Sequence, residues 1–400
     1  MSDPDRVCLT DRQMMLAVNS VEKFFIGMIC PVIIFFGISG NILNLTVLLA
    51  PNMRTRSNLL LACLALADIV FLIFMLPHSL AHYRIFAFSY WFRRLYLGNK
   101  MHLLAVLNWA SAAAIWLVFV ICLERLMGIK YPLSVRKHKK ILTPATLVTF
   151  VVVTTGILTS YNHFSYFCAT RHFCNGTQFH AMCLPMDSEK WFRNQTNPNS
   201  AFIKGVAHWG PHVNAIFVVV LPILMVLVSN AMLIYTLRQR QKLFMMGQTS
   251  VKPESNQFNG AQSRTEHKVT ITVCSIVTMF TITQGPSALI TIMAEYYPIQ
   301  HEWMIAVTAV ITTLVVLGKA LNFVLFCLSS ATFRGRLMLR TKKGLLRQTT
   351  RHNSTMHTTT TLVETVGRPE PYAVKRTMRA NSECEERIPL RNVKRGMSMM

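Results

Sequence analysis

The stretch Ile-Cys-Leu-Glu-Arg-Leu-Met-Gly-Ile-Lys-Tyr-Pro-Leu, residues 121–133, decides the fold. It closes an apolar run that carries no charged residue from Met101 to Leu123, and the adjacent charges Glu124 and Arg125 follow at once. A run of that length can cross a bilayer as a helix. A charged pair is tolerated where such a helix meets water, and its partners come from the ends of neighbouring helices. The stretch therefore predicts a membrane helix that ends in a charged pair at the water interface.

The composition is typical of a membrane protein. The 400 residues are 52% hydrophobic and 14% charged, whereas a soluble domain is about 25% charged. The formal net charge of +24 suggests nucleic acid, but the chain has no basic stripe with interleaved aromatic residues and no recognition-helix pattern, so no nucleic-acid partner is expected. Residues 1–23 lack the pattern of a secretory signal, and the first span is expected to act as its own insertion signal.

Apolar runs follow one another along the chain. Each is long enough for the roughly 20 helical residues that cross a hydrocarbon core. Backbone polar groups in lipid must be paired within the protein, so the runs are expected to be helices. The predicted fold class is an all-α membrane protein, a seven-transmembrane helix bundle. The seven runs are 24–50, 57–83, 101–123, 141–170, 205–237, 269–294 and 303–333.

Three regions are expected from changes in composition. Residues 1–23 form an extracellular N-terminus, residues 24–340 form the seven-transmembrane domain with a short amphipathic eighth helix, and residues 341–400 form a disordered cytoplasmic tail. Basic residues favour the orientation with the N-terminus outside. The sequons at Asn175 and Asn194 then lie in one outer loop and are candidate glycosylation sites. The chain is expected to cross the plasma membrane several times.

A series of short motifs accompanies the runs in a fixed order and spacing. They are Gly40-Asn41, Asn58, Leu64-Ala65-Leu66-Ala67-Asp68, Trp91, Glu124-Arg125-Leu126, Tyr131-Pro132-Leu133, Pro222, Pro286, Asn322 and Phe326. As a set they resemble the rhodopsin-like (class A) G-protein-coupled receptors, over about residues 24–340. Within that family the sequence is most similar to invertebrate neuropeptide receptors of the FMRFamide and myosuppressin type.

The resemblance implies a receptor that is not an enzyme and has no cofactor. A neuropeptide outside the cell would favour outward movement of span 6, and a heterotrimeric G protein would bind inside. Arrestin and receptor kinases are further partners that the family implies, acting on the hydroxyl-rich tail. The alternatives are a seven-helix chemoreceptor for a non-peptide ligand, an insect-type channel of inverted topology, a membrane enzyme and a transporter. The last predicts repeated halves, which the sequence does not have.

The resemblance assigns the cytoplasmic switch to Arg125. In the inactive state of the family, this arginine is tied to the adjacent acid, here Glu124, and to an acid at the foot of span 6, here Glu266. Tyr131 and Pro132 belong to the segment that couples to the G protein. A guanidinium holds carboxylates through two parallel hydrogen bonds, so outward movement of span 6 would free Arg125. The other interpretation is a solvated group of charges at a helix end.

Asp68 and Lys319 are the full charges deep within the runs. At helical rise, Asp68 lies about 16 Å from the start of its run and Lys319 lies about 15 Å from Ser329 near the inner end of its run, and spans 2 and 7 are neighbours in the family. A buried charge is costly without a partner, so an ion pair is expected, with Asn322 beside it. The family binds sodium at the Asp68 position, and the ammonium of Lys319 would replace that ion. Lys319 reaching an internal water pocket is the alternative.

A ligand pocket is expected near the outer ends of the runs. The run 101–123 contains no Asp or Glu, and this argues against an amine ligand, because amine receptors of the family hold the ammonium with a carboxylate there. The residues expected to face inwards are His78, His82, Asn108, Trp109, Asn214, Gln284, Thr291, Thr308 and Thr312. Charges at the mouth that could meet a peptide are Glu22, Glu295, Glu302, Arg84, Arg93, Arg94 and Lys100. Ordinary packing is the alternative for each.

Cysteines outside the membrane are candidates for disulfides, because that compartment is oxidising. They are Cys8, Cys168, Cys174 and Cys183. Four cysteines allow three pairings, and the sequence does not choose among them. No metal site is predicted. The family usually has a further cysteine at the outer end of span 3, where this chain has Lys100, so the resemblance implies that the usual disulfide between span 3 and the outer loop is missing.

Overall fold

The computed structural model describes residues 7–17, 19–51, 55–130, 143–192, 195–247, 274–275, 277–290, 293, 302–329 and 335. All of them belong to the compact unit Met1–Thr341. The expected eighth helix at 330–340, apart from Gly335, and the tail at 341–400 lie outside the described residues.

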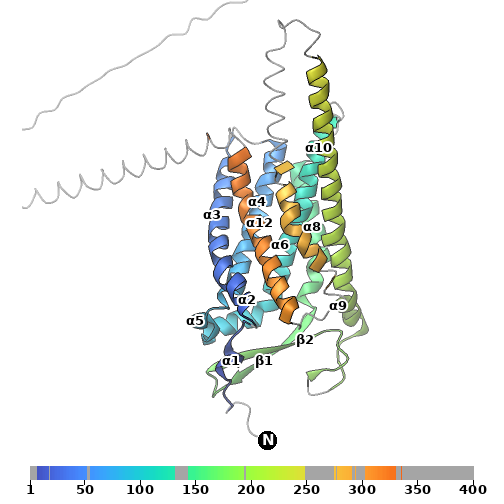
Figure 1. Cartoon of the computed structure of the whole chain (residues 1–400). Coiled ribbons are helices and arrows are strands. Elements are labelled where there is room, and N and C mark those ends of the chain that lie inside the picture. The colour runs from blue at the N-terminus through green and yellow to red at the C-terminus, as the bar shows by residue number, and fades with distance from the viewer. Residues whose placement is uncertain are drawn as a thin grey trace, which may run out of the picture. The chain divides into compact units, whose positions relative to one another are not determined.

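Long helices lie side by side and form the bundle (Figure 1). Six of those in the described part of the chain are long and apolar enough to cross a membrane. The described part of the sixth expected run, residues 277–290, is also helical. The labelled elements are α2 (Ser20–Glu22), η2 (Lys23–Ile29), α3 (Cys30–Leu48), α4 (Arg56–Leu80), α6 (Tyr90–Lys130), α8 (Pro144–Thr159), η4 (Ser160–His163), α9 (Ala201–Val213), η6 (Asn214–Val220), α10 (Leu221–Gly247) and α12 (Glu302–Ser329).

Capping residues set where several helices begin. The hydroxyl of Thr55 accepts a hydrogen bond from the backbone N–H of Asn58 at the start of α4. Thr143 does the same for the N–H of Thr146 at the start of α8. Pro144 follows that cap, at a position where a helix needs no N–H donor. These caps pair backbone donors that the first helical turn would otherwise leave unsatisfied.

Helix α4 packs between α3 and α6, and α12 packs against α3. The contact between α3 and α12 is close, because a Cβ atom at Gly40 would lie 2.8 Å from the side chain of Phe323. The outward surface of the bundle is apolar, with Val32, Phe35 and Ile157 each about 70% exposed. Such an apolar surface suits contact with lipid rather than water.

Two expected boundaries need correction. The segment 84–100, which separates the second and third expected runs, is mostly helical: α5 (Arg84–Ala87) is followed by α6, which begins at Tyr90 and has 41 residues. The fourth run ends earlier than expected, because α8 stops at Thr159 and a strand begins at Tyr166. Charge and hydropathy mark where the chain leaves lipid, whereas a helix can continue past that point into water.

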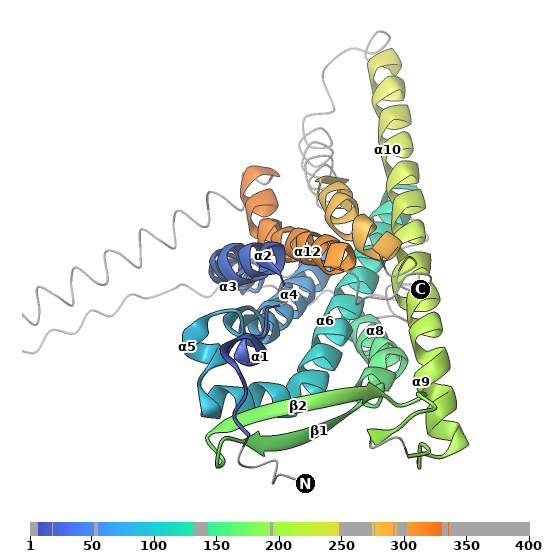
Figure 2. The same cartoon turned by 60° about the horizontal axis from the view of Figure 1, so that its bottom comes forward.

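The outer loop between α8 and α9 contains a β-hairpin, which the all-α expectation did not include. Strand β1 (Tyr166–Phe173) pairs antiparallel with β2 (Gln178–Pro185). The turn between them contains Asn175 at φ 53° and Gly176 at φ 84°, and both residue types adopt this left-handed region more readily than most others. Figure 2 shows the hairpin lying across one end of the bundle.

The N-terminal segment crosses the hairpin (Figure 2) and is bonded to it. A disulfide joins Cys8 to Cys174 at the hairpin turn, and a second joins Cys168 to Cys183 across the two strands. The backbone N–H of Cys174 also donates to the carbonyl of Val7. A short helix, α1 (Asp11–Met14), follows this contact. The hairpin register thus selects one of the three possible pairings, because it places Cys168 directly opposite Cys183.

Candidate functional site

The charged pair Glu124–Arg125 lies near the inner end of α6. The Nε atom of Arg56, at the foot of α4, lies 3.0 Å from Oε1 of Glu124. Adjacent residues on a helix point about 100° apart, so Glu124 faces α4 while Arg125 points along another face. The contact with Arg56 was not predicted from the sequence. The other residues of the expected switch lie outside the described residues: Glu266, Tyr131 and Pro132.

Asp68 and Lys319 meet in the middle of the bundle. Lys319 Nζ lies 3.2 Å from Asp68 Oδ1, and Nδ2 of Asn322 donates to Asp68 Oδ2 at 2.5 Å. Both charged side chains are no more than 2% exposed. The ammonium also lies 4.7 Å from the ring centroid of Phe71, where a cation is attracted to the ring face. Each oxygen of the carboxylate therefore has a cationic or amide partner, and the ammonium of Lys319 supplies a positive charge beside it.

We expect this protein to be insensitive to sodium. Its thermal stability should not differ between sodium chloride and choline chloride at equal ionic strength, because an ion that binds only the native state raises stability through mass action and Lys319 already neutralises Asp68. Lys319→Met should gain stabilisation by sodium. A sodium effect in the wild-type chain that disappears in Asp68→Asn would contradict this account.

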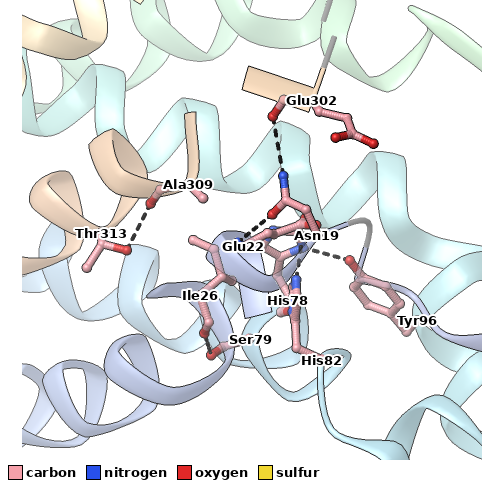
Figure 3. A network of polar contacts seen from close by, with 10 residues as sticks. All are labelled: Asn19, Glu22, Ile26, His78, Ser79, His82, Tyr96, Glu302, Ala309 and Thr313. Carbon is pink, nitrogen blue, oxygen red and sulfur yellow. Dashed lines mark hydrogen bonds and ion pairs between the residues drawn. The ribbon is translucent and has the colours of Figure 1, made fainter. Parts of the chain in front are cut away.

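A polar network joins helix ends at the outer side of the bundle (Figure 3). His78 Nδ1 lies 2.7 Å from the hydroxyl of Tyr96, which connects α4 to α6. His82 is 3% exposed; its Nδ1 lies 3.0 Å from the carbonyl oxygen of His78, and its Nε2 lies 3.4 Å from Oε1 of Glu22. The sequence placed both histidines near the outer ends of the runs, and the structure brings them together with Glu22.

Asn19 extends this network to α12. Its side chain accepts a hydrogen bond from the backbone N–H of Glu22 at 2.7 Å and donates to the carbonyl of Glu302 at 3.3 Å. The hydroxyl of Ser79 donates to the carbonyl of Ile26, which holds α4 against η2. Figure 3 shows these groups converging between the helix ends. The network therefore connects the N-terminal segment with α4, α6 and α12.

Two expected pocket residues point elsewhere. Asn108 and Trp109 are exposed on the side of α6 that faces α8. The amide of Asn108 donates to Oδ1 of Asn162, and the indole N–H of Trp109 donates to the carbonyl of Val152. The absence of a side chain at Gly156 makes room for the indole, because a Cβ there would lie 3.1 Å from Trp109 Nε1. The expected inward orientation of both residues is therefore corrected.

The remaining pocket candidates are spread over three elements. Gln284 is buried at 2% exposure in the helical segment 277–290. Thr308 and Thr312 are half-buried on α12, and Asn214 is half-buried at the start of η6. Thr291 lies outside the described residues.

Arg93 was expected at the mouth of the pocket, where it could meet a peptide. The structure corrects this expectation, because Arg93 is buried. Its side chain is 0% exposed and donates to three backbone carbonyls. Arg84, by contrast, is exposed and pairs with Asp11 at 3.0 Å. Of the two sequons, Asn175 is exposed at the hairpin turn, and Asn194 lies outside the described residues.

Comparison with known proteins gives a family match over most of the chain. The family model for serpentine-type seven-transmembrane G-protein-coupled chemoreceptors, Srw, matches residues 28–339. A Caenorhabditis elegans protein named as a G-protein coupled receptor is 54% identical over 98% of this chain and 97% of its own length. Sex peptide receptor-related protein 2 of the same organism is 23% identical over 82% of this chain and 74% of its own length. The FMRFamide receptor of Drosophila melanogaster is 22% identical over 84% of this chain and 58% of its own length.

Proposed function

The chain belongs to the Srw family of serpentine seven-transmembrane G-protein-coupled receptors, and from that premise we propose that a neuropeptide outside the cell activates it. As a family member it is a multi-pass plasma-membrane receptor rather than an enzyme, and its partners are a ligand and a G protein. The ligand class is the part that is proposed. The relatives named after peptides, the sex peptide receptor-related protein and the FMRFamide receptor, support it because each aligns with more than 80% of this chain.

The observation that carries the proposal is the hairpin with its two disulfides at the outer end. Cross-links restrict the hairpin and the N-terminal segment to a narrow set of arrangements, which reduces the ordering cost of binding a flexible ligand. The hairpin also presents apolar side chains to solvent, with Tyr166 at 44%, Phe167 at 45% and Met182 at 61% exposure. Aromatic and methionine side chains of this kind are common at interfaces with peptides and proteins.

In this proposal, the ligand shifts the network at the outer helix ends, and the inner ends respond. Binding would favour one arrangement of the bundle only through a difference in affinity between two arrangements. The network of His78, His82 and Glu22 links α4 to the N-terminal segment, and Asn19 links that segment to α12. At the inner end, Arg125 is the residue proposed to bind the G protein after it separates from Glu266. Arrestin and receptor kinases are proposed as partners of the hydroxyl-rich tail.

A screen of amidated neuropeptides against cells that express this chain tests the proposal. We expect at least one peptide to raise a G-protein response at nanomolar to micromolar concentration, about the range for complexes of −8 to −12 kcal/mol. Untransfected cells and cells expressing Arg125→Ala are the controls. If every peptide fails and a lipid, an amine or another small molecule activates the receptor, the peptide assignment is wrong.

A non-peptide chemical cue is the second candidate, favoured by one observation. The matched family is described as a chemoreceptor family, and it covers residues 28–339. The same cells, screened with small volatile and soluble compounds, decide between the two candidates.

A further inference from the structure

Arg93 is a buried cation in the first turn of α6 that donates to three backbone carbonyls. Its Nε donates to the carbonyl of Phe179 at 2.6 Å. Its Nη1 donates to the carbonyls of Met14 at 2.6 Å and Ala87 at 2.9 Å. These carbonyls belong to β2, α1 and α5. The fixed planar fork of a guanidinium suits several simultaneous acceptors, so one side chain joins three separate segments to α6.

The two disulfides do not perform this task. One joins the strands of the hairpin to each other, and the other joins the hairpin turn to the N-terminal segment. Neither reaches a helix of the bundle. The hairpin contacts α6 through Arg93, through ring contacts of Tyr90 with His172 and Phe179, and through an apolar cluster in which Phe179, at 5% exposure, packs with Tyr96 and Leu97. Apart from the backbone that joins β1 to η4, these contacts with the bundle are non-covalent, and Arg93 supplies hydrogen bonds among them.

His180 makes this attachment dependent on protonation. Arg93 Nη2 lies 3.3 Å from Nδ1 of His180. A guanidinium can only donate, so Nδ1 must accept and the neutral ring carries its proton on Nε2. Protonation of Nδ1 would place two donors and two positive charges against each other. The charged groups that face His180 are Arg93 from α6 and Arg171, directly opposite on β1. Burial and then the charge of Arg93 lower the pKa of His180.

We infer that Arg93 anchors the hairpin to the bundle and that protonation of His180 releases it, so that extracellular acidity controls how closely the hairpin covers the outer helix ends. Released His180 titrates near its ordinary pKa of about 6.5, and docked His180 titrates lower. Docking is therefore complete above about pH 6.5 and weakens as pH falls towards the docked pKa, by up to about tenfold per pH unit. The anchoring is independent of the ligand; only its effect on ligand access rests on the proposed function.

Hydroxyl-radical footprinting of the full chain in lipid nanodiscs, at about pH 7.5 and about pH 5.5, tests this inference. Met14 and Phe179 are 4% and 5% exposed beside Arg93 and report release. Met182, on β2 and 61% exposed, is the internal reference. Relative to Met182, oxidation of both probes should be slow at the higher pH and increase by up to about tenfold at the lower pH.

Three variants separate the anchoring role of Arg93 from the pH response of His180. Arg93→Met should expose both probes at both pH values, and Arg94→Met, which removes the exposed neighbouring arginine, should behave as wild type. His180→Asn keeps an acceptor near the Nδ1 position but does not titrate, so the probes should stay protected at both pH values. His180→Asn therefore tests whether protonation of His180 releases the hairpin, even if Arg93→Met does not fold.

The inference fails if acid leaves both wild-type probes protected, if His180→Asn responds to acid as the wild type does, or if a folded Arg93→Met keeps them protected. None of these measurements uses a ligand. Their outcome is therefore separate from that of the peptide screen.

Discussion

Replacing Arg125 by alanine is expected to abolish agonist-stimulated nucleotide exchange on the G protein and to leave ligand binding near the wild-type level. Arg125 lies five residues before the end of α6, far from the outer network, and Glu124 beside it contacts Arg56. Hydrogen bonds from a charged donor are worth about 1.5–3 kcal/mol each. Since a tenfold change corresponds to about 1.4 kcal/mol, loss of even one such bond should reduce coupling to the G protein by tenfold or more. Exchange measured in membranes, with surface expression matched, checks this expectation.

Arg125→Lys is the graded control. Lysine keeps the charge but lacks the planar fork, so its coupling should fall between those of the wild type and Arg125→Ala. Full exchange by Arg125→Ala would refute the assignment of Arg125 as the switch and favour a solvated helix-end charge.

Replacing Lys319 by methionine is expected to be the most destabilising single change in the bundle core. It leaves the carboxylate of Asp68 buried at 1% exposure with Asn322 but without its cation. Removal of one partner from a buried ion pair costs about 3–5 kcal/mol. A thermal-inactivation series in detergent, read by ligand binding or by a thiol-reactive dye, measures the loss.

The double variant Asp68→Asn/Lys319→Met supplies the control. Asparagine can still accept a hydrogen bond from Asn322 and carries no charge, so most of the lost stability should return. If the stability loss of the double variant equals the sum of the losses of the two single variants, Asp68 and Lys319 do not stabilise each other. Asp68→Asn alone should cost less than Lys319→Met, because the ammonium of Lys319 keeps its contact with the ring of Phe71.

The sequence predicts the helical bundle well because backbone polar groups in lipid must be hydrogen-bonded within the protein, which few structures achieve. Uncharged runs of sufficient length must form helices there, and six described helices meet that requirement. The contact between Asp68 and Lys319 can be anticipated in the same way, because two opposite charges at equal depth each need a partner. What could not be predicted is which face of a helix meets which neighbour. Asn108 and Trp109 show this, since their orientation depends on Asn162 and Gly156 in another part of the chain.

The hairpin has a signal in the sequence that the all-α expectation does not include. Asn175-Gly176 lies between two runs that contain aromatic residues, a pattern that favours a tight hairpin turn. The same residues also form the sequon Asn175-Gly176-Thr177. The pairing of the four cysteines follows from strand register, which sequence does not specify without the hairpin. The burial of Arg93 has no local signal, because two of its carbonyl acceptors, in Phe179 and Met14, belong to distant segments.

Nucleotide exchange by the purified receptor tests the central claim most directly, namely that a peptide outside activates a G protein inside through Arg125. The chain is reconstituted in nanodiscs with a heterotrimeric G protein, and exchange is measured before and after addition of the most active peptide from the screen. The account predicts acceleration by the peptide in the wild type and none in Arg125→Ala. Exchange that no peptide changes, but that a small non-peptide compound accelerates, would contradict it.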